Sequence, residues 1–327
     1  MADKQTPLPG EHDLPTNRGV MLTSMGEGGT ITVTDLDMPA PEDDGIVIRV
    51  AAASINPVDW KVRDGEALFL KQEDLPAPMG RDCAGTIALV GTAAHNMIRR
   101  GDRVMAHVGS MDRGTQARFV KVAATEFTAV PDAVDLVEAA AVGLVGMTAY
   151  QGLFDHGRLE AGQKVLIHGG AGGVGQVAVQ LARIKGVTVY ATCSGKDVDF
   201  VRSLGAEKVI DHKATRFEEE VDQVDLVFDL IGGEVQDRSF AVIRDGGTLI
   251  TTLAENDTPN PPRGIRVESY MAQPNMVQMS EILGYMVQGR LKVTVAQTVP
   301  LEQAADAYER DRQGHERGKT MLVMDEG

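Results

Sequence analysis

The feature that most constrains this chain is a glycine-rich turn between an apolar strand pattern and an amphipathic helix pattern. The run reads Lys164-Val-Leu-Ile-His-Gly-Gly-Ala-Gly-Gly-Val-Gly175, and it fits the pattern G-x-G-x-x-G. In this context a bare backbone lets the helix N-terminus present free N–H groups and partial positive charge to a pyrophosphate. A tight turn without a ligand is the alternative, but the strand that follows favours a dinucleotide site. The predicted phosphate-binding residues are Gly170, Ala171, Gly172, Gly173, Val174 and Gly175.

The segment after the next strand indicates which dinucleotide is bound. An NAD site usually places an acidic residue at this point for the ribose hydroxyls, and the run Tyr190–Lys196 has none. Ser194 can donate a hydrogen bond and Lys196 supplies positive charge, so the sequence favours NADPH. A solvated lysine, with Asp197 weakening its field, is the alternative explanation of Lys196. His212 follows the next strand and is a further candidate beside the adenosine.

The rest of the chain divides into regions that differ in composition and in predicted secondary structure. Residues 1–19 are polar and Pro-rich, which predicts a flexible leader. Short β-rich runs follow and predict a mostly-β domain, whereas strands alternate with helices after Pro131. The tail is too short to fold alone, so we expect it to pack back on the first β region. The predicted domains are therefore 20–133 joined with 267–327, and 134–266.

Composition disfavours several classes of protein. Lys and Arg total 32 against 47 Asp and Glu, and the net charge of −15 argues against nucleic-acid binding. Cys83 and Cys193 are the only cysteines and form no C-x-x-C pair, which fits a reducing compartment, the cytoplasm. We expect no membrane association, because the N-terminus is polar and no apolar run of about 18 residues stands out.

With these motifs placed, the chain resembles the medium-chain dehydrogenase/reductase superfamily, and within it the zinc-independent quinone oxidoreductase and enone reductase group. The shared motifs include Ser54-Ile-Asn-Pro-Val-Asp-Trp-Lys61, Gly80-Arg-Asp-Cys-Ala-Gly85, Gly146-Met-Thr-Ala-Tyr150, the glycine turn and Gly318-Lys-Thr-Met-Leu322. The resemblance implies an α/β fold, with a GroES-like, mostly-β catalytic domain and a Rossmann domain built on a doubly wound parallel sheet. It also implies a homodimer that transfers hydride from NADPH to quinones or α,β-unsaturated carbonyl compounds.

The resemblance further implies that this chain has no metal site. The zinc alcohol dehydrogenases of the superfamily carry a ligand cysteine and a ligand histidine where this chain has Asn56 and Arg81. Neither residue type suits zinc, and the seven histidines show no ligand-like spacing. Conjugate hydride addition needs no metal, because hydrogen-bond donors can stabilise the negative charge that develops on a carbonyl or quinone oxygen.

Three residues are candidates for the reaction itself, and each also has a structural explanation. Asn56 is a candidate for a hydrogen bond to substrate or ribose, or else it is a turn residue before Pro57. Lys61 is a candidate proton donor, or else a solvent-facing lysine. Thr148 occupies the family position that contacts nicotinamide, or else it bonds to its own helix backbone.

Three further residues are expected to contact the cofactor. The resemblance places Leu253 and Ala254 against the nicotinamide carboxamide, and Lys319 is a candidate for a phosphate or substrate contact.

Two other functions stay open at this stage. Reduction of enoyl thioesters needs basic contacts for the phosphates of coenzyme A, and the acidic composition argues against these. A non-catalytic, NADPH-binding or scaffold protein of the same fold is the second alternative.

Overall fold

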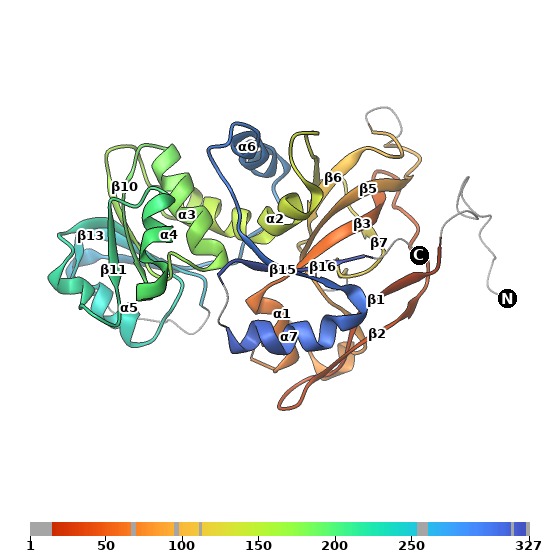
Figure 1. Ribbon diagram of the computed structural model, residues 1–327, viewed down its shortest axis with the longest axis horizontal. Helices are drawn as coiled ribbons and strands as arrows, with labels where there is room; N and C mark the ends of the chain where they lie inside the picture. Colours follow the sequence, from red (N-terminus) through yellow and green to blue (C-terminus); the bar gives the residue numbers. More distant parts are fainter. Residues whose placement is uncertain are drawn as a thin grey trace. The chain divides into compact units, whose positions relative to one another are not determined.

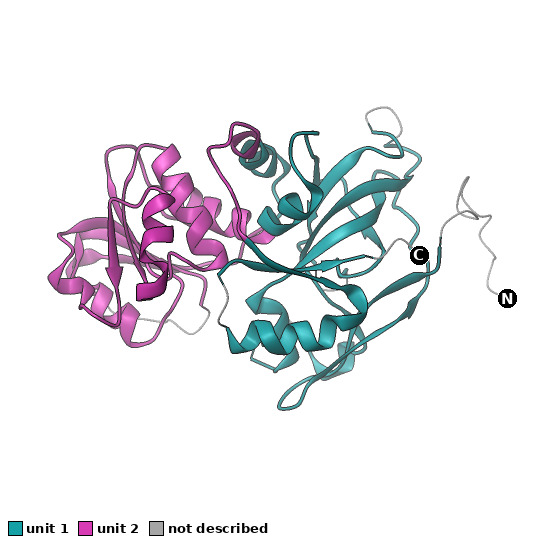
Figure 2. Ribbon diagram, viewed as in Figure 1, with its two compact units in different colours: residues 1–143, 274–283, 295–327 teal, residues 144–273, 284–294 magenta. Residues whose placement is uncertain are grey.

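The computed structural model describes residues 15–66, 70–94, 98–110, 113–253, 261–314 and 317–324. It divides into two compact units, shown in Figure 2: unit 1 comprises residues 1–143, 274–283 and 295–327, and unit 2 comprises residues 144–273 and 284–294. Most of the C-terminal tail therefore belongs with the N-terminal β region. The pairing is direct, because β16 (Lys319–Val323) lies antiparallel beside β3 (Ile46–Ile55).

Unit 1 is built on two β-sheets (Figure 1). The seven-stranded sheet has the order β15-β16-β3-β5-β6-β8, with β7 also pairing with β3, and the three-stranded sheet has the order β2-β1-β4. Strand β3 is central and buries Ile46, Val47 and Ile48 completely. The other strands of unit 1 are β1 (Asn17–Ser24), β2 (Thr30–Leu36), β4 (Ala77–Pro78), β5 (Asp82–Val90), β6 (Arg103–His107), β7 (Phe119–Val122), β8 (Phe127–Ala129) and β15 (Val295–Pro300).

Two short helices complete the part of unit 1 that positions the candidate site. Helix α1 (Pro57–Arg63) follows β3 directly and has proline at its first position, where a missing N–H group costs nothing. It contacts α7 (Ala304–Gln313), as Figure 1 shows. Ion pairs join the two helices, Arg63 to Glu309 at 2.6 Å and Arg312 to Asp64 at 2.7 Å. The packing fixes α1 against the end of β3.

Unit 2 is a parallel sheet in the strand order β11-β10-β9-β12-β13-β14. This order reverses direction between β9 and β12, which is the doubly wound topology predicted from the sequence. Its helix α3 (Gly173–Ile184) packs on β9 and β10, and α4 (Val198–Ser203) packs on β10 and β11. The strands and the last helix are β9 (Lys164–Ile167), β10 (Thr188–Cys193), β11 (Lys208–Asp211), β12 (Val224–Asp229), β13 (Ile243–Thr251), β14 (Arg266–Ser269) and α5 (Glu234–Ser239).

Two helices contain a boundary between the units. One is α6 (Met276–Val287), and the other is α2 (Leu136–Tyr150), which continues as a π-helical turn over Gln151–His156. By length and composition the stretch Leu136–His156 passes as a membrane span, which the sequence expectation overlooked, but 72% of its most apolar window is buried in the structure. That burial is typical of a core helix.

The observed division differs from the expected one in four places, of which the first is residues 134–143, which belong to unit 1. Strand β1 already includes Asn17–Gly19 of the expected leader. The buried Asn17 side chain holds this end of the strand, because it donates a hydrogen bond to Phe119 O and accepts one from Phe119 N. Residues 1–14 lie outside the described residues. Strand β14 pairs with β13 in unit 2, and residues 284–294 also belong to unit 2.

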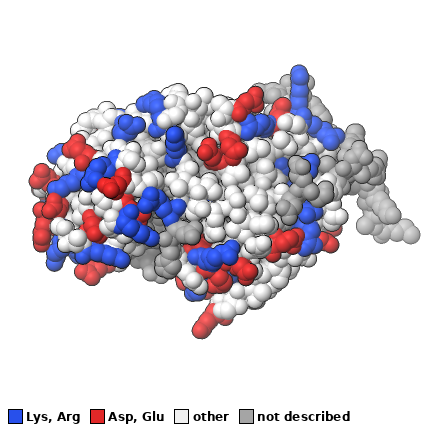
Figure 3. Space-filling view, in the orientation of Figure 1, with Lys and Arg blue, Asp and Glu red and all other residues white. Residues whose placement is uncertain are grey.

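Acidic and basic side chains are mixed on the face of the molecule in Figure 3. Charged side chains also pair within a unit: in unit 2, Arg238 contacts Glu218 at 2.6 Å and Arg244 contacts Asp225 at 2.7 Å. Each such pair is neutral, so it does not contribute to the negative net charge of the chain.

Candidate active site

The glycine turn of unit 2 has the geometry of a phosphate cradle. Gly169 has φ +74°, a left-handed conformation that favours glycine, and it turns the chain out of β9. A methyl group on Gly175 would lie 2.1 Å from the Gly169 carbonyl oxygen, so only glycine fits there. A methyl group on Gly172 would meet just one atom, that same oxygen at 3.3 Å. Gly172 thus caps the N-terminus of α3 beside open space that a side chain would fill.

The turn is anchored on the neighbouring strand. Gly170 N donates to Thr192 O at 2.8 Å, which ties the turn to β10. His168, fully buried at the end of β9, bonds Thr192 Oγ1 at 3.1 Å and Ser239 Oγ at 2.9 Å. Burial lowers the His168 pKa to about 3, so the ring is neutral and links β9, β10 and α5. The predicted residues 170–175 therefore sit on a rigid edge of the sheet.

The loop after β12 adds residues that the sequence analysis missed. Asp229 is fully buried, and its Oδ1 accepts hydrogen bonds from Ile231 N and Gly232 N, both at 3.0 Å. Its Oδ2 has no partner among the described residues, and burial raises the pKa of this carboxyl. Ile231 is 55% exposed and reaches toward Gly169. The turn signal Gly232-Gly233 after an apolar strand was available in the sequence.

The predicted ribose segment lies at the end of β10. Ser194 Oγ donates to Asp197 Oδ2 at 2.6 Å, so its hydroxyl is already used within the segment. Lys196 is exposed, and His212 Nδ1 bonds Cys193 O at 2.8 Å, which fixes the imidazole beside the strand end. The structure thus brings Ser194, Lys196 and His212 to one strand end.

Thr148 and Leu253 also belong to unit 2. The Thr148 hydroxyl donates to Leu144 O at 2.8 Å, one helical turn earlier, and the Thr148 carbonyl accepts from the Tyr270 hydroxyl. This is the helix-backbone bond that the sequence analysis gave as the alternative. Leu253 N donates to Thr251 Oγ1 at 3.1 Å at the end of β13. Ala254 lies outside the described residues.

A buried polar network surrounds Asn56 in unit 1. Asn56 Nδ2 donates to Ser54 Oγ and to Asp82 Oδ1, both at 2.9 Å, and its Oδ1 accepts from Lys319 Nζ at 2.6 Å. Ser54 Oγ also donates to Asp82 Oδ1 at 2.5 Å. Asn56 is 1% exposed. Both of its amide hydrogens are thus bound inside unit 1, and only its acceptor oxygen retains hydrogen-bonding capacity.

Lys319 has a different environment from the one a phosphate contact requires. The residue is 4% exposed, and its ammonium donates to Ile55 O at 2.7 Å as well as to Asn56. Burial lowers its pKa, while the nearby Asp82 carboxylate opposes that effect. Lys319 therefore holds the β3–α1 junction, and this geometry does not support the predicted phosphate contact.

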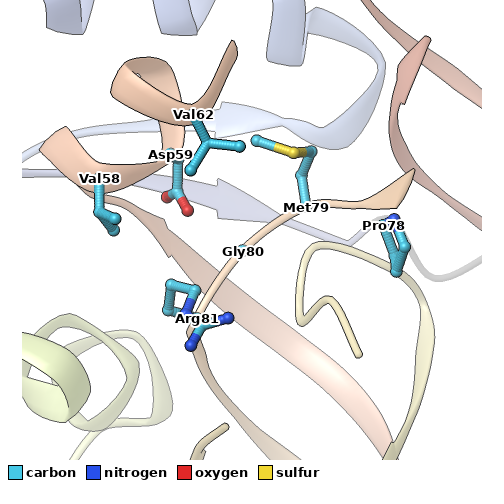
Figure 4. A pocket seen from close by; sticks show the side chains of 7 residues that line it. All are labelled: Val58, Asp59, Val62, Pro78, Met79, Gly80 and Arg81. Atoms are coloured by element: carbon cyan, nitrogen blue, oxygen red, sulfur yellow. The ribbon is translucent and has the colours of Figure 1, made fainter. Parts of the chain in front are cut away.

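A small pocket lies between α1 and the segment before β5 (Figure 4). The Asp59 carboxylate points into it from α1, Arg81 lines the opposite side, and Val62 faces Met79. The space holds about one water molecule. Arg81 is buried and donates to the carbonyls of Gly109 and Ser110, both at 2.9 Å, so it supports that loop.

Asp59 is a second buried acid of this network. Its Oδ2 accepts from Asn56 N at 2.9 Å, a helix-capping bond. Burial raises its pKa to about 7, with Asp82 adding to the effect and Arg81 and Lys319 opposing it. Gln116, which bonds Ser54 O at 3.0 Å, carries the network on to the buried Tyr308 hydroxyl at 2.7 Å.

Lys61 is the third residue expected in the reaction. It is half-buried on α1, and its ammonium lies 5.9 Å from the centroid of the Trp60 ring. Within the described ranges, no group of three or more His, Cys, Asp or Glu side chains is arranged to hold a metal ion.

Comparisons with known proteins agree over nearly the whole chain. A family model described as alcohol dehydrogenase GroES-like domain matches residues 42–132, and one described as zinc-binding dehydrogenase matches residues 204–322. An NADPH-dependent alkenal/one oxidoreductase of Arabidopsis thaliana chloroplasts is 32% identical over 88% of this chain and 74% of its own length. Human quinone oxidoreductase is 26% identical over 89% of this chain and 92% of its own length.

Solved structures give the same result. The quinone oxidoreductase of Coxiella burnetii superimposes with a TM-score of 0.89 at 28% identity, covering 95% of this chain and all of that one. The enoyl reductase CurK superimposes with a TM-score of 0.84 at 25% identity, over 95% of this chain and all of that one.

Proposed function

Because the chain belongs to the medium-chain dehydrogenase/reductase superfamily, in its quinone oxidoreductase group, we propose that it reduces quinones or α,β-unsaturated carbonyl compounds with NADPH. The observation that carries the proposal is the glycine turn of unit 2, where Gly172 leaves space at the N-terminus of α3 and Gly175 excludes any side chain. The names of relatives that act on alkenals, alkenones and quinones support the substrate class.

The residues present fit a bound dinucleotide. The first N–H groups of α3 follow directly on Gly172, its N-cap residue, and they suit the two phosphates of the cofactor. Ile231, exposed beside Gly169 at the reversal of the sheet, suits an apolar face of the same molecule. When bound, NADPH supplies the hydride that the acceptor receives.

The preference for NADPH rests on the end of β10. This strand ends at Cys193 with no acidic side chain at the usual position, and Lys196 provides an exposed positive charge in the segment that follows. The Arabidopsis relative is named for NADPH, which also supports this choice. The residues of the segment favour a cofactor with a 2′-phosphate.

We propose that the reaction proceeds without zinc. The two positions that carry zinc ligands in the zinc alcohol dehydrogenases are Asn56 and Arg81 here, and both are engaged, Asn56 in the buried network and Arg81 with two carbonyls. Their role is to hold the β3–α1 junction and its neighbouring loop rigid. Negative charge on the substrate oxygen would be stabilised by hydrogen-bond donors, for which Lys61 stays a candidate and Thr148 stays the candidate on the nicotinamide side.

The test is a direct assay of NADPH oxidation. Protein and NADPH are mixed with an ortho-quinone, a short enone or an enoyl thioester, and absorbance of the reduced nicotinamide is followed. We expect oxidation with the quinone or the enone, and no loss of rate after dialysis against a metal chelator. Turnover of the thioester alone would show an enoyl-thioester reductase, and cofactor binding without turnover would show a binding protein.

Two expectations from the sequence stay predictions. A homodimer is to be checked by light scattering of the purified chain, and a cytoplasmic location by fractionation of cells that express it.

A further inference from the structure

An acidic side chain approaches the ribose segment from a neighbouring strand. Strands β10 and β11 run parallel, with Cys193 beside Asp211 at their ends. A methyl group built on Gly195 would lie 2.5 Å from Asp211 Oδ2, so the carboxylate lies directly against the backbone of this segment. A side chain at this position would displace the carboxylate. The acidic residue of an NAD site usually stands at the end of the strand that follows the glycine turn, which is β10 here. Asp211 stands at the end of the next strand, β11, so the spacing of that motif in the sequence does not point to it.

The orientation of this carboxylate is fixed. Asp211 is half-buried, and its Oδ1 accepts from Lys213 N at 3.0 Å. Its carbonyl accepts from Ala214 N and Thr215 N, both at 3.0 Å, which closes the turn after β11. Oδ2 is thereby held on the side that faces Gly195.

The segment carries charges of both signs. Lys196 and Lys213 are exposed cations, His212 is fixed on Cys193 O, and the two carboxylates are Asp211 and the buried Asp197. Asp197 accepts the Ser194 hydroxyl at 2.6 Å, so that hydroxyl is directed at a carboxylate. A phosphate dianion placed at this strand end would be attracted by the lysines and repelled by the carboxylates. A ribose hydroxyl, in contrast, can donate a hydrogen bond to Asp211.

We infer that Asp211 is a specificity-determining residue that limits the preference for NADPH over NADH, by repelling the 2′-phosphate that Lys196 attracts. The inference rests on the proposed function, because it needs a nicotinamide dinucleotide at the glycine turn. It predicts a protein that binds both cofactors and distinguishes them by less than about tenfold.

The test is a titration of the full chain with NADPH, NADH and adenosine 2′,5′-bisphosphate, followed by calorimetry or intrinsic fluorescence, without any acceptor. Asp211→Asn removes the charge and keeps the shape and the acceptor oxygen for Lys213 N. We expect the ratio of the NADH to the NADPH dissociation constant to rise about tenfold, through tighter binding of NADPH and the bisphosphate. The gain should shrink at high salt.

The matched control is Asp222→Asn, which changes the net charge equally but lies just before β12, at the amino end of the sheet. Its cofactor ratio should equal that of the wild type. An unchanged ratio in Asp211→Asn, or a wild type that already prefers NADPH by a hundredfold or more, overturns the inference while leaving the proposed function intact. A wild type that binds neither cofactor overturns both. If Asp211→Asn does not fold, the wild-type ratio by itself can still overturn the inference.

Discussion

Asn56 belongs to a motif associated with function, but its side chain has a structural role. Its carboxamide lies between the Lys319 ammonium and the Asp82 carboxylate, so a buried cation and a buried anion are joined through one amide. The ammonium, the carboxamide and the carboxylate thus all have hydrogen-bond partners although they are buried from water. The junction between β3 and α1 is thereby fixed by side chains that come from three different strand ends.

Lys319→Met tests this role against a phosphate contact. The substitution removes the Lys319 donor from Ile55 O and Asn56 Oδ1 and leaves Arg81 as the remaining cation that acts on Asp82, so we expect a loss of about 2–4 kcal/mol in the free energy of unfolding. NADPH affinity of the folded protein should be unchanged. Denaturant unfolding and cofactor titration measure the two effects separately. Weaker NADPH binding with normal stability would show that Lys319 contacts the cofactor after all.

Gly172 and Gly175 stand three residues apart and should respond differently to added side chains. Gly172→Val fills the space at the N-terminus of α3, so we expect NADPH binding to be abolished while the unfolding temperature changes little. Gly175→Ala instead drives a methyl group to 2.1 Å from Gly169 O and should destabilise the fold itself. Titration and thermal unfolding of both variants give the comparison. Normal NADPH affinity in Gly172→Val would refute the proposed phosphate site.

Lys196 is predicted to provide attraction for the 2′-phosphate. Lys196→Glu adds repulsion at an exposed position, so we expect kcat/KM for NADPH to fall about tenfold or more relative to NADH. The ratio of kcat/KM for the two cofactors, measured with one acceptor, reports the change. Lys292→Glu, elsewhere in unit 2, is the control for net charge. Equal ratios in the Lys196 variant and the wild type would show that Lys196 takes no part.

At the scale of elements, the strands and helices of unit 2 were the most predictable part of the chain. The run 164–168 becomes β9, 174–185 becomes α3 and 188–192 becomes β10, each within a residue or two. The sequence within each of these elements is enough to predict it, because the spacing of apolar residues gives its type and the glycine or charged residues at its ends give its bounds. The glycine turn was predictable for the same reason, because its function depends on the backbone of one continuous segment.

Elements that depend on distant partners were not predictable. Strand β14 is a polar edge strand that exists through pairing with β13, and Asn17 extends β1 because its side chain bonds Phe119, 102 residues away. The bonds of Asn56 with Lys319 span 263 residues. No short-range pattern specifies such contacts. The same is true of Asp211, which reaches the ribose segment only through strand pairing.

At the scale of the whole molecule, stability should depend on pH through a few buried ionisable groups. His107 and His168 have pKa values lowered to about 3 by burial, so the unfolded chain binds more protons below pH 6.5 and these groups destabilise the fold in acid. Asp59 acts in the opposite direction. Its pKa of about 7 in the folded protein exceeds the unfolded value of 3.8, so between these two values the folded state binds more protons.

Asp59→Asn isolates this contribution. The groups that act on Asp59 are Arg81, Asp82 and Lys319, with Tyr308 linked through Gln116, and none of them changes in the variant. The stabilisation that protonated Asp59 gives the wild type is complete below pH 3.8 and is lost as pH rises toward 7. The wild type should therefore lose stability relative to Asp59→Asn by up to about 1.4 kcal/mol per pH unit across this window.

Denaturant unfolding of the wild type and of Asp59→Asn at intervals from pH 4 to pH 8 measures the difference between their free energies of unfolding. His107 and His168 contribute equally to both proteins, so their contributions cancel in this difference. Asp199→Asn is the control, since its side chain is 97% exposed on α4 and should leave the slope unchanged. A constant difference between the wild type and Asp59→Asn across the range would mean that Asp59 is ionised in the folded protein. The network would then hold two buried carboxylates, Asp59 and Asp82, against the buried cations Arg81 and Lys319, with the four charges balanced.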